Sequence, residues 1–200
     1  KWQSQGNREA QIKELWNAYV PEQLLPRLHG YELMMAPYAI AHMKIGLKLY
    51  ETGYRFESDE RARVFLTNAL EPAQDFSGTL AFAIPALAHE AEAVNAIKQH
   101  QRFTVVIGNP PYSGHSSNNQ VQWIVNKVHD FKREYPDLQK PGQAKWLQDD
   151  YVKFLRYAQW QIELTSHGVV GFVTNHAWLE NPTFKGMRRC FLMAFDRLEV

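Results

Sequence analysis

The sequence predicts an α/β protein in which strands and helices alternate and the strands form a mostly parallel sheet. A nearly continuous apolar run at residues 103–108 has the composition of a parallel strand that is buried on both faces, and a second apolar run at 169–174 is also predicted as a strand. Between the predicted strands, apolar residues recur at the three- and four-residue spacing of amphipathic helices. The hydrophobic fraction of 45% can fill a core, and the charged fraction of 22% gives no sign of disorder.

In the first hundred residues, the pattern predicts three helices and two strands. A helix is expected at residues 8–19 and should end at Pro21, because proline lacks a backbone N–H and disrupts a helix interior. The following elements are predicted in order as a strand at 28–33, a helix from Pro37 to residue 50, a strand at 62–67 and a helix at 87–99.

The second hundred residues contain one long polar segment between predicted strands and helices. Residues 113–147 are rich in Ser, Asn, Gln, Lys and Pro, and we interpret them as an insertion around a possible helix at 121–131. The remaining elements are predicted as a strand at 103–108, a helix at 149–165, a strand at 169–174, a helix at 184–194 and a final strand at 196–200.

Composition excludes several classes of protein. The formal net charge is only +1, so a nucleic-acid surface would depend on local basic clusters such as Lys185, Arg188 and Arg189. The single cysteine, Cys190, excludes an internal disulfide framework and is typical of a reducing compartment. No apolar run approaches the roughly 18 residues of a membrane span, and we expect a cytoplasmic protein without a membrane partner. No histidine pair has metal-ligand spacing, so no metal site is predicted.

The stretch Asn109-Pro110-Pro111-Tyr112 directly follows the first buried strand and carries the clearest chemical signal. Ligands of open parallel sheets collect at the carboxyl ends of strands. Two consecutive prolines hold the backbone extended and leave rigid carbonyl acceptors, while Asn109 adds an amide oxygen and Tyr112 a flat aromatic face. Two fixed acceptors can bind both hydrogens of an exocyclic amine and favour its tetrahedral transition state. The alternative is a stiff loop with a half-buried tyrosine.

This tetrapeptide resembles the catalytic motif of the amino-methyltransferases, most closely that of the adenine-N6 DNA methyltransferases. The resemblance implies a Rossmann-like fold, S-adenosylmethionine as cofactor, and catalytic roles for Asn109, Pro110, Pro111 and Tyr112 on an adenine flipped out of the duplex. Segments that resemble the family's other motifs occur in its order. They imply cofactor-binding roles for Glu32 and Leu33, for Asn68 and Leu70, and for Phe154.

Residues 32–42 resemble one subgroup in particular, the single-polypeptide (type I-like, ISP) restriction-modification enzymes. In that subgroup, methyltransferase, helicase-like motor and nuclease share one long chain, which implies double-stranded DNA as partner. The family's glycine-rich cofactor loop and its first, central strand are absent. Residues 1–200 therefore resemble an incomplete methyltransferase domain, and a target-recognition domain is expected downstream.

Two alternatives remain open on the sequence. Protein-glutamine methyltransferases use the same tetrapeptide, and some RNA-guanine methyltransferases use a close variant. The chain could also be a non-catalytic fragment, which would bind S-adenosylmethionine weakly or not at all. Near the expected pocket, His176 and Trp178 are interpreted as structural, and the loop at 113–120 either closes over DNA or is a surface loop.

Overall fold

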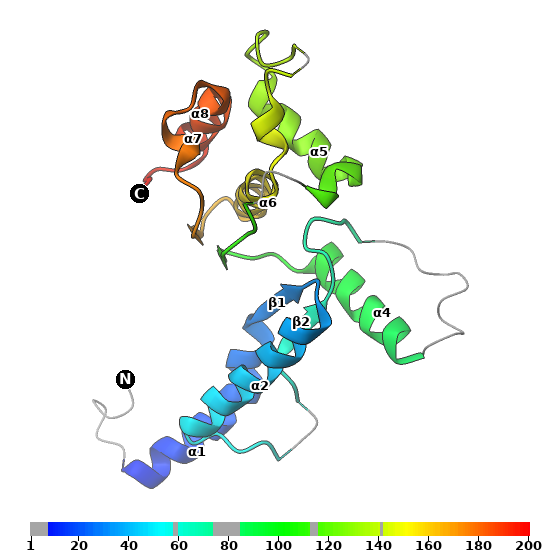
Figure 1. The fold of residues 1–200 in the computed structure, drawn as a ribbon. Helices are drawn as coiled ribbons and strands as arrows, with labels where there is room; N and C mark the ends of the chain where they lie inside the picture. The colour runs from blue at the N-terminus through cyan, green and yellow to red at the C-terminus, as the bar shows by residue number, and fades with distance from the viewer. Residues whose placement is uncertain (1–7, 58–59, 74–84, 113–115, 141) are drawn as a thin grey trace. The chain divides into compact units, whose positions relative to one another are not determined.

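The computed structural model describes residues 8–57, 60–73, 85–112, 116–140 and 142–200. The chain divides into two compact units. Unit 1 comprises Lys1–Ala69 and Asp75–Asn95, and unit 2 comprises Leu70–Gln74 and Ala96–Val200. Short parallel strands alternate with helices along the chain, which confirms the predicted α/β class (Figure 1).

Unit 1 contains a two-stranded parallel sheet. Strands β1 and β2 pair in register from His29 opposite Arg63 to Glu32 opposite Leu66. Its elements are α1 (Glu9–Tyr19), β1 (His29–Glu32), α2 (Met35–Glu51), β2 (Arg63–Leu66) and the first part of α4 (Pro85–His100). These bounds confirm the strands and helices predicted for this part of the sequence.

The first helix ends at Tyr19, two residues before Pro21, as predicted. The backbone continues as a π-helical turn, η2 (Val20–Leu24), and then as a 3₁₀ turn, η3 (Leu25–Arg27). Each proline lies in the first turn of its short helix, where the N–H that proline lacks has no intrahelical partner. The continuation places Val20 and Leu25 in a buried cluster with Leu49 and Tyr54.

Unit 2 contains a second two-stranded parallel sheet, with β3 and β4 in register from Val105 opposite Val169 to Gly108 opposite Phe172. Its elements after α4 are β3 (Val105–Gly108), η4 (Ser117–Gln120), α5 (Gln122–Val128), η5 (His129–Lys132), η6 (Lys145–Gln148), α6 (Asp150–Thr165), β4 (Val169–Phe172), α7 (Ala177–Glu180), η7 (Pro182–Phe184) and α8 (Lys185–Ala194).

The polar segment at 113–147 supplies part of the core of unit 2. Val128, Phe131 and Leu147 are fully buried or nearly so, and they pack in one cluster with residues of α6 and α8. The C-terminal residues 196–200 are irregular and exposed rather than a strand, because no neighbouring strand in the described part of the chain pairs with them. The strand predicted at 196–200 is therefore wrong.

The expectation that the strand at 103–108 is buried on both faces is also wrong. Val105 and Ile107 point to one face and are 62% and 78% exposed, and Val169 of β4 lies on the same face at 62%. The opposite face is covered, because Phe172 packs against the unit 2 core. The sequence shows that these side chains are apolar, but it does not show which segment covers them.

Candidate active site

The carboxyl ends of β3 and β4 lie at one edge of the unit 2 sheet, and the predicted catalytic tetrapeptide begins there. The Val173 N–H donates to the Gly108 carbonyl at 3.0 Å, which fixes the residue directly before Asn109. Asn109 is exposed and Pro110 is buried, while Tyr112 is 50% exposed. The rigid proline is thus anchored, and the amide and the phenol ring remain accessible to a ligand.

The turn after β4 lies at the same edge and is held by side-chain hydrogen bonds. The indole N–H of Trp178 donates to Thr174 Oγ1 at 3.2 Å, and Arg188 Nη1 donates to the carbonyls of Trp178 at 2.7 Å and Asn181 at 2.9 Å. Trp178 also packs edge-on against Phe191, as expected for a core residue. Arg188 therefore fixes this turn.

The other basic residues of its cluster make surface ion pairs within unit 2. Lys185 pairs with Asp137 at 2.7 Å, and Arg189 pairs with Glu134 at 2.8 Å. Surface pairs of this kind contribute little stability.

The chain after the tetrapeptide is held by a buried polar network around Lys153. Residues 113–115 lie outside the described part, and the loop becomes described again at Ser116. Lys153 is fully buried, and its ammonium group contacts the Ser116 hydroxyl, donates to Asn119 Oδ1 at 2.8 Å and lies 3.4 Å from Asp150 Oδ1. Residues 116–120 are therefore anchored to the first turn of α6.

In unit 1, the carboxyl end of β1 carries two of the predicted cofactor residues. Glu32 Oε1 accepts from the Met34 N–H at 2.9 Å, directly before the first residue of α2, and the Glu32 carbonyl accepts from the Thr67 N–H at 2.8 Å. Leu33 is 63% exposed beside it. Asn68 is half-buried and follows β2 by two residues. Glu32 and Asn68 thus follow adjacent parallel strands at one edge of the sheet.

The other two predicted cofactor residues, Leu70 and Phe154, belong to one apolar cluster of unit 2. Leu70 is completely buried with Ile124 and Tyr157, and Phe154 packs against this group from α6. Burial raises the pKa of Tyr157 to about 12, while Gln161 donates a hydrogen bond to its hydroxyl at 3.0 Å. The cluster brings together a residue that follows β2 and the aromatic side of α6.

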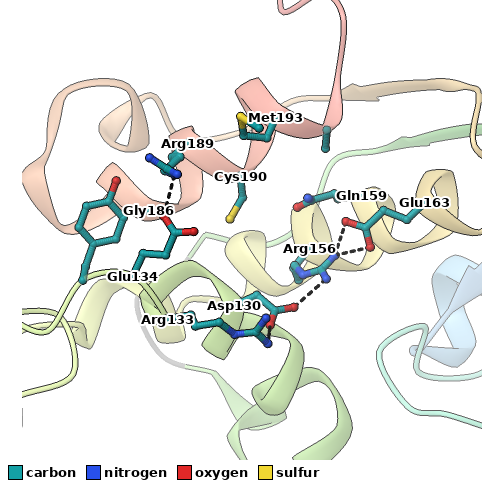
Figure 2. A pocket seen from close by; sticks show the side chains of 12 residues that line it. Asp130, Arg133, Glu134, Arg156, Gln159, Glu163, Gly186, Arg189, Cys190 and Met193 are labelled. Carbon is teal, nitrogen blue, oxygen red and sulfur yellow. Dashed lines mark hydrogen bonds and ion pairs between the residues drawn. The ribbon is translucent and has the colours of Figure 1, made fainter.

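A cavity of about 480 Å³ lies elsewhere in unit 2 (Figure 2). Arg156 lines this cavity between two carboxylates, with Nη2 at 2.9 Å from Asp130 Oδ2 and Nη1 at 3.2 Å from Glu163 Oε2. Cys190 also lines the cavity, and burial raises the pKa of its thiol. None of the predicted catalytic or cofactor residues lines it.

The described residues contain no group of three His, Cys, Asp or Glu side chains that could hold a metal ion. No helix among them has the length and apolar character needed to cross a membrane.

Residues 31–198 match the family of Eco57I restriction-modification methylases. The chain belongs to this family. The match contains β2, β3 and β4, the carboxyl end of β1 and the tetrapeptide after β3. A search of curated protein sequences found no match.

Solved structures similar to this methylase-family chain are much longer proteins. It is 27% identical to DrdV in a complex with DNA, with a TM-score of 0.67, over 92% of this chain and 18% of that one. A nuclease-deletion mutant of the Type ISP restriction-modification enzyme LlaGI, in complex with a DNA substrate mimic, is 22% identical with a TM-score of 0.70, over 94% and 16%. The ATP-dependent Type ISP enzyme LlaBIII, bound to DNA, is 21% identical with a TM-score of 0.68, over 92% and 13%. The chain thus spans less than a fifth of each.

The Lys153 network is the part of the site that the sequence pattern did not reveal. One signal was present, because Asp150 and Lys153 stand three residues apart on a helix that is otherwise largely apolar. Their partner Ser116 lies far away in the sequence, and no local pattern predicts that contact.

Proposed function

We propose that the chain is the catalytic part of a DNA methyltransferase that transfers a methyl group from S-adenosylmethionine to the N6 amine of a flipped adenine, within a restriction-modification enzyme. One observation carries the proposal: Asn109-Pro110-Pro111-Tyr112 follows a parallel strand at the ligand-binding edge of the sheet, in a chain of the Eco57I methylase family. The DNA complexes of similar proteins support DNA as the substrate.

The residues of the tetrapeptide have the properties that this reaction requires. The exposed Asn109 amide oxygen accepts one amine hydrogen, and the carbonyl of the buried Pro110 accepts the other. These two acceptors favour the tetrahedral nitrogen of the transition state. The half-exposed ring of Tyr112 stacks on the flipped base and compensates for the stacking that the base loses when it leaves the duplex.

The residues at the carboxyl end of β1 fit the ribose of the cofactor. Glu32 uses Oε1 for the Met34 N–H, and Oε2 makes no hydrogen bond within the described residues, so it can accept from a ribose hydroxyl. The exposed Leu33 and the half-buried Asn68 would contact the adenosine part. Leu70 and Phe154, which share an apolar cluster of unit 2, are also proposed to contact the cofactor. When bound, S-adenosylmethionine supplies the methyl group.

For the fold of the methyltransferase domain, we propose a Rossmann-like sheet. The two parallel pairs are separate sheets in the described residues, as expected if a central strand and a glycine-rich cofactor loop complete the domain. A target-recognition domain would then select the DNA sequence. Helicase-like and nuclease domains in the same polypeptide are proposed from the similarity to Type ISP enzymes.

The test is a methylation assay on the full-length protein. The protein would be incubated with S-adenosylmethionine and DNA of mixed sequence, and nucleosides from the digested DNA would be identified by mass spectrometry. We expect N6-methyladenine with the wild type and a loss on the order of 10²- to 10³-fold with Asn109→Ala, as for removal of one preorganised hydrogen-bonding group.

Other products would identify which part of the proposal fails. Methylcytosine alone would show that the target base is wrong while the amine chemistry holds. Unmodified DNA together with methylated protein glutamine or RNA guanine would show that the substrate is a protein or an RNA and not DNA. No methyl transfer to any of these acceptors, together with no binding of S-adenosylmethionine, would support a non-catalytic role.

A further inference from the structure

The catalytic tetrapeptide lies between two fixed points of the chain, Gly108 and Ser116. On its N-terminal side, the Gly108 carbonyl is fixed by the Val173 N–H, and Pro110 is buried. On its C-terminal side, Ser116 is fixed by the Lys153 network. Tyr112 and Ser116 are four residues apart, so a fixed Ser116 keeps Tyr112 within roughly 14 Å by chain length alone.

Lys153 is an unusual residue at its position. Its side chain is completely buried, although lysine is almost never fully buried unless it is paired. Desolvation lowers its pKa, and the carboxylate of Asp150 opposes that shift. A buried ammonium without partners would cost far more than an apolar side chain of the same size, so its contacts have to compensate.

The contacts of Lys153 extend the anchor beyond a single ion pair. Besides Ser116, Asn119 and Asp150, the ammonium donates to the Gln148 carbonyl at 2.6 Å. The Ser116 hydroxyl also contacts Asp150 Oδ1 and accepts from the Asn118 N–H at 3.0 Å. Every hydrogen of the ammonium thus has an acceptor, and two of the acceptor side chains come from the loop that follows the tetrapeptide.

We propose that Lys153 is a positioning residue for methyl transfer: through Ser116 and Asn119, it fixes the chain after Asn109-Pro110-Pro111-Tyr112 and so holds the tetrapeptide in its reactive geometry. This inference rests on the proposed methyltransferase function. It also assigns the loop at 116–120 as a fixed support rather than a lid. Phe154, the next residue of α6, belongs to the apolar cluster with Leu70, so the same helical turn supports the predicted cofactor side.

The decisive variants remove or retain one hydroxyl group. In the full-length protein, Ser116→Ala deletes the group that contacts Lys153, Asp150 and the Asn118 N–H, whereas Ser116→Thr retains it. Lys153→Met removes the whole anchor, while Asp150 still accepts from Asn118 Nδ2 at 3.0 Å. The matched control is Gln139→Ala, because Gln139 Nε2 also ties a loop of unit 2 by donating to the carbonyls of Lys132 and Arg133.

The expected result is a specific loss of turnover. We expect Ser116→Ala and Lys153→Met to lower kcat for N6-methyladenine formation on the order of 10- to 100-fold, the scale of a small misplacement of reacting groups. Ser116→Thr and Gln139→Ala should keep kcat close to the wild-type value. For Ser116→Ala, the dissociation constant for S-adenosylmethionine should stay unchanged, and the thermal unfolding midpoint should fall only slightly, because Asn119, Gln148 and Asp150 still contact the Lys153 ammonium.

Three outcomes would overturn the inference while leaving the proposed function intact. These are a wild-type kcat in Ser116→Ala, an equal loss in Gln139→Ala, and a loss of kcat that follows only a fall in the unfolding midpoint. If the wild-type protein itself makes no N6-methyladenine, the proposed function has failed first. Hydrogen exchange of residues 109–119 would then test the anchor directly, and unchanged exchange in Ser116→Ala would overturn it.

Discussion

The two parallel strand pairs have the same topology and carry different chemistry at their carboxyl ends. The unit 1 pair ends in Glu32, an acidic residue whose carboxylate accepts from the Met34 N–H and whose carbonyl accepts from the Thr67 N–H. The unit 2 pair ends in a neutral amide followed by two prolines. A carboxylate suits hydroxyl donors such as a ribose, and fixed neutral acceptors suit an amine that must stay a nucleophile. The two sheets thus share a topology and end in side chains of different chemistry.

The units also differ in where they place charge. In unit 1, the ion pair Lys48–Glu51 lies at the surface, with side chains 75% and 64% exposed. In unit 2, Lys153 and Arg156 are buried and paired. Buried pairs fix one arrangement of the chain around them at the cost of desolvation, so unit 2 should be less tolerant of change. The following predictions test that contrast.

The largest expected effect comes from two glycine substitutions. A Cβ at Gly186 in α8 would overlap the Phe131 carbonyl oxygen, whereas a Cβ at Gly46 in α2 meets no atom within 4 Å. We expect Gly186→Ala to lower the free energy of unfolding of unit 2 by about 3 kcal/mol. Gly46→Ala should raise that of unit 1 by up to about 1 kcal/mol, because alanine favours a helix interior. Chemical denaturation measures both, and equal effects would contradict the contrast.

Glu32 allows the effect of its charge to be separated from that of its hydrogen bond to Met34. Glu32→Gln retains an oxygen for the Met34 N–H and removes the charge, so binding of S-adenosylmethionine should weaken by about 2 kcal/mol, or roughly 30-fold. Glu32→Ala should lose that affinity and also about 1 kcal/mol of stability, because the Met34 N–H loses its acceptor. Calorimetric titration and thermal unfolding of the full-length protein measure the two effects. Wild-type affinity in Glu32→Gln would exclude a ribose contact.

Tyr112 tests the role proposed for the strand end of unit 2. Tyr112→Ala should weaken binding to DNA with a base analogue that is already unpaired by about 1.4 kcal/mol, or roughly tenfold, because stacking is lost. Tyr112→Phe should bind like the wild type, since the phenyl ring keeps the stacking face that is half-exposed here. Fluorescence anisotropy measures both affinities. A similar loss in the two variants would assign the role to the hydroxyl group instead.

The smallest predicted effect is a pH dependence within unit 2. Lys98 is half-buried and donates to the Glu71 carbonyl at 2.9 Å, and desolvation lowers its pKa from 10.5 to about 8. The folded state loses this proton at a lower pH than the unfolded chain does. Burial of the charged amine therefore destabilises the folded state fully below pH 8, and this destabilisation disappears as the pH rises toward 10.5. Lys98→Met should therefore be more stable than the wild type at pH 7, by about 1 kcal/mol after allowance for solvent screening, and the gap should close by pH 10.5. Urea unfolding across this range measures it, and a constant gap would refute the assignment.

Much of the fold could be predicted because each element carries its own periodicity. The strand ending at Glu32 and the helix from Asp150 to Thr165 were found within two residues of their observed bounds. The end of α1 at Tyr19 was predicted, but the π-helical and 3₁₀ turns that follow it were not, because a proline in the first turn of a new helix resembles a helix end in the sequence. The strand at 103–108 was mispredicted in burial, because coverage depends on other segments.

The candidate site could be predicted only where its residues are consecutive. Asn109-Pro110-Pro111-Tyr112 and Glu32-Leu33 are short runs at strand ends, and their roles remain predictions. The anchor formed by Lys153 joins residues of two distant segments, and its lysine looks like an ordinary solvent-facing residue in the sequence. Such tertiary pairings require the structure.

The buried guanidinium of Arg156 forms ion pairs that dissolved salt should weaken only a little. It is 7% exposed, contacts Asp130 and Glu163, and also donates to the Lys127 carbonyl at 3.2 Å (Figure 2). Dissolved ions screen buried pairs much less than exposed ones, whereas contacts between a protein and DNA phosphates weaken steeply as salt is added. Concentrated salt should therefore leave this internal ion network in place, whereas it would weaken the proposed contacts with DNA phosphates.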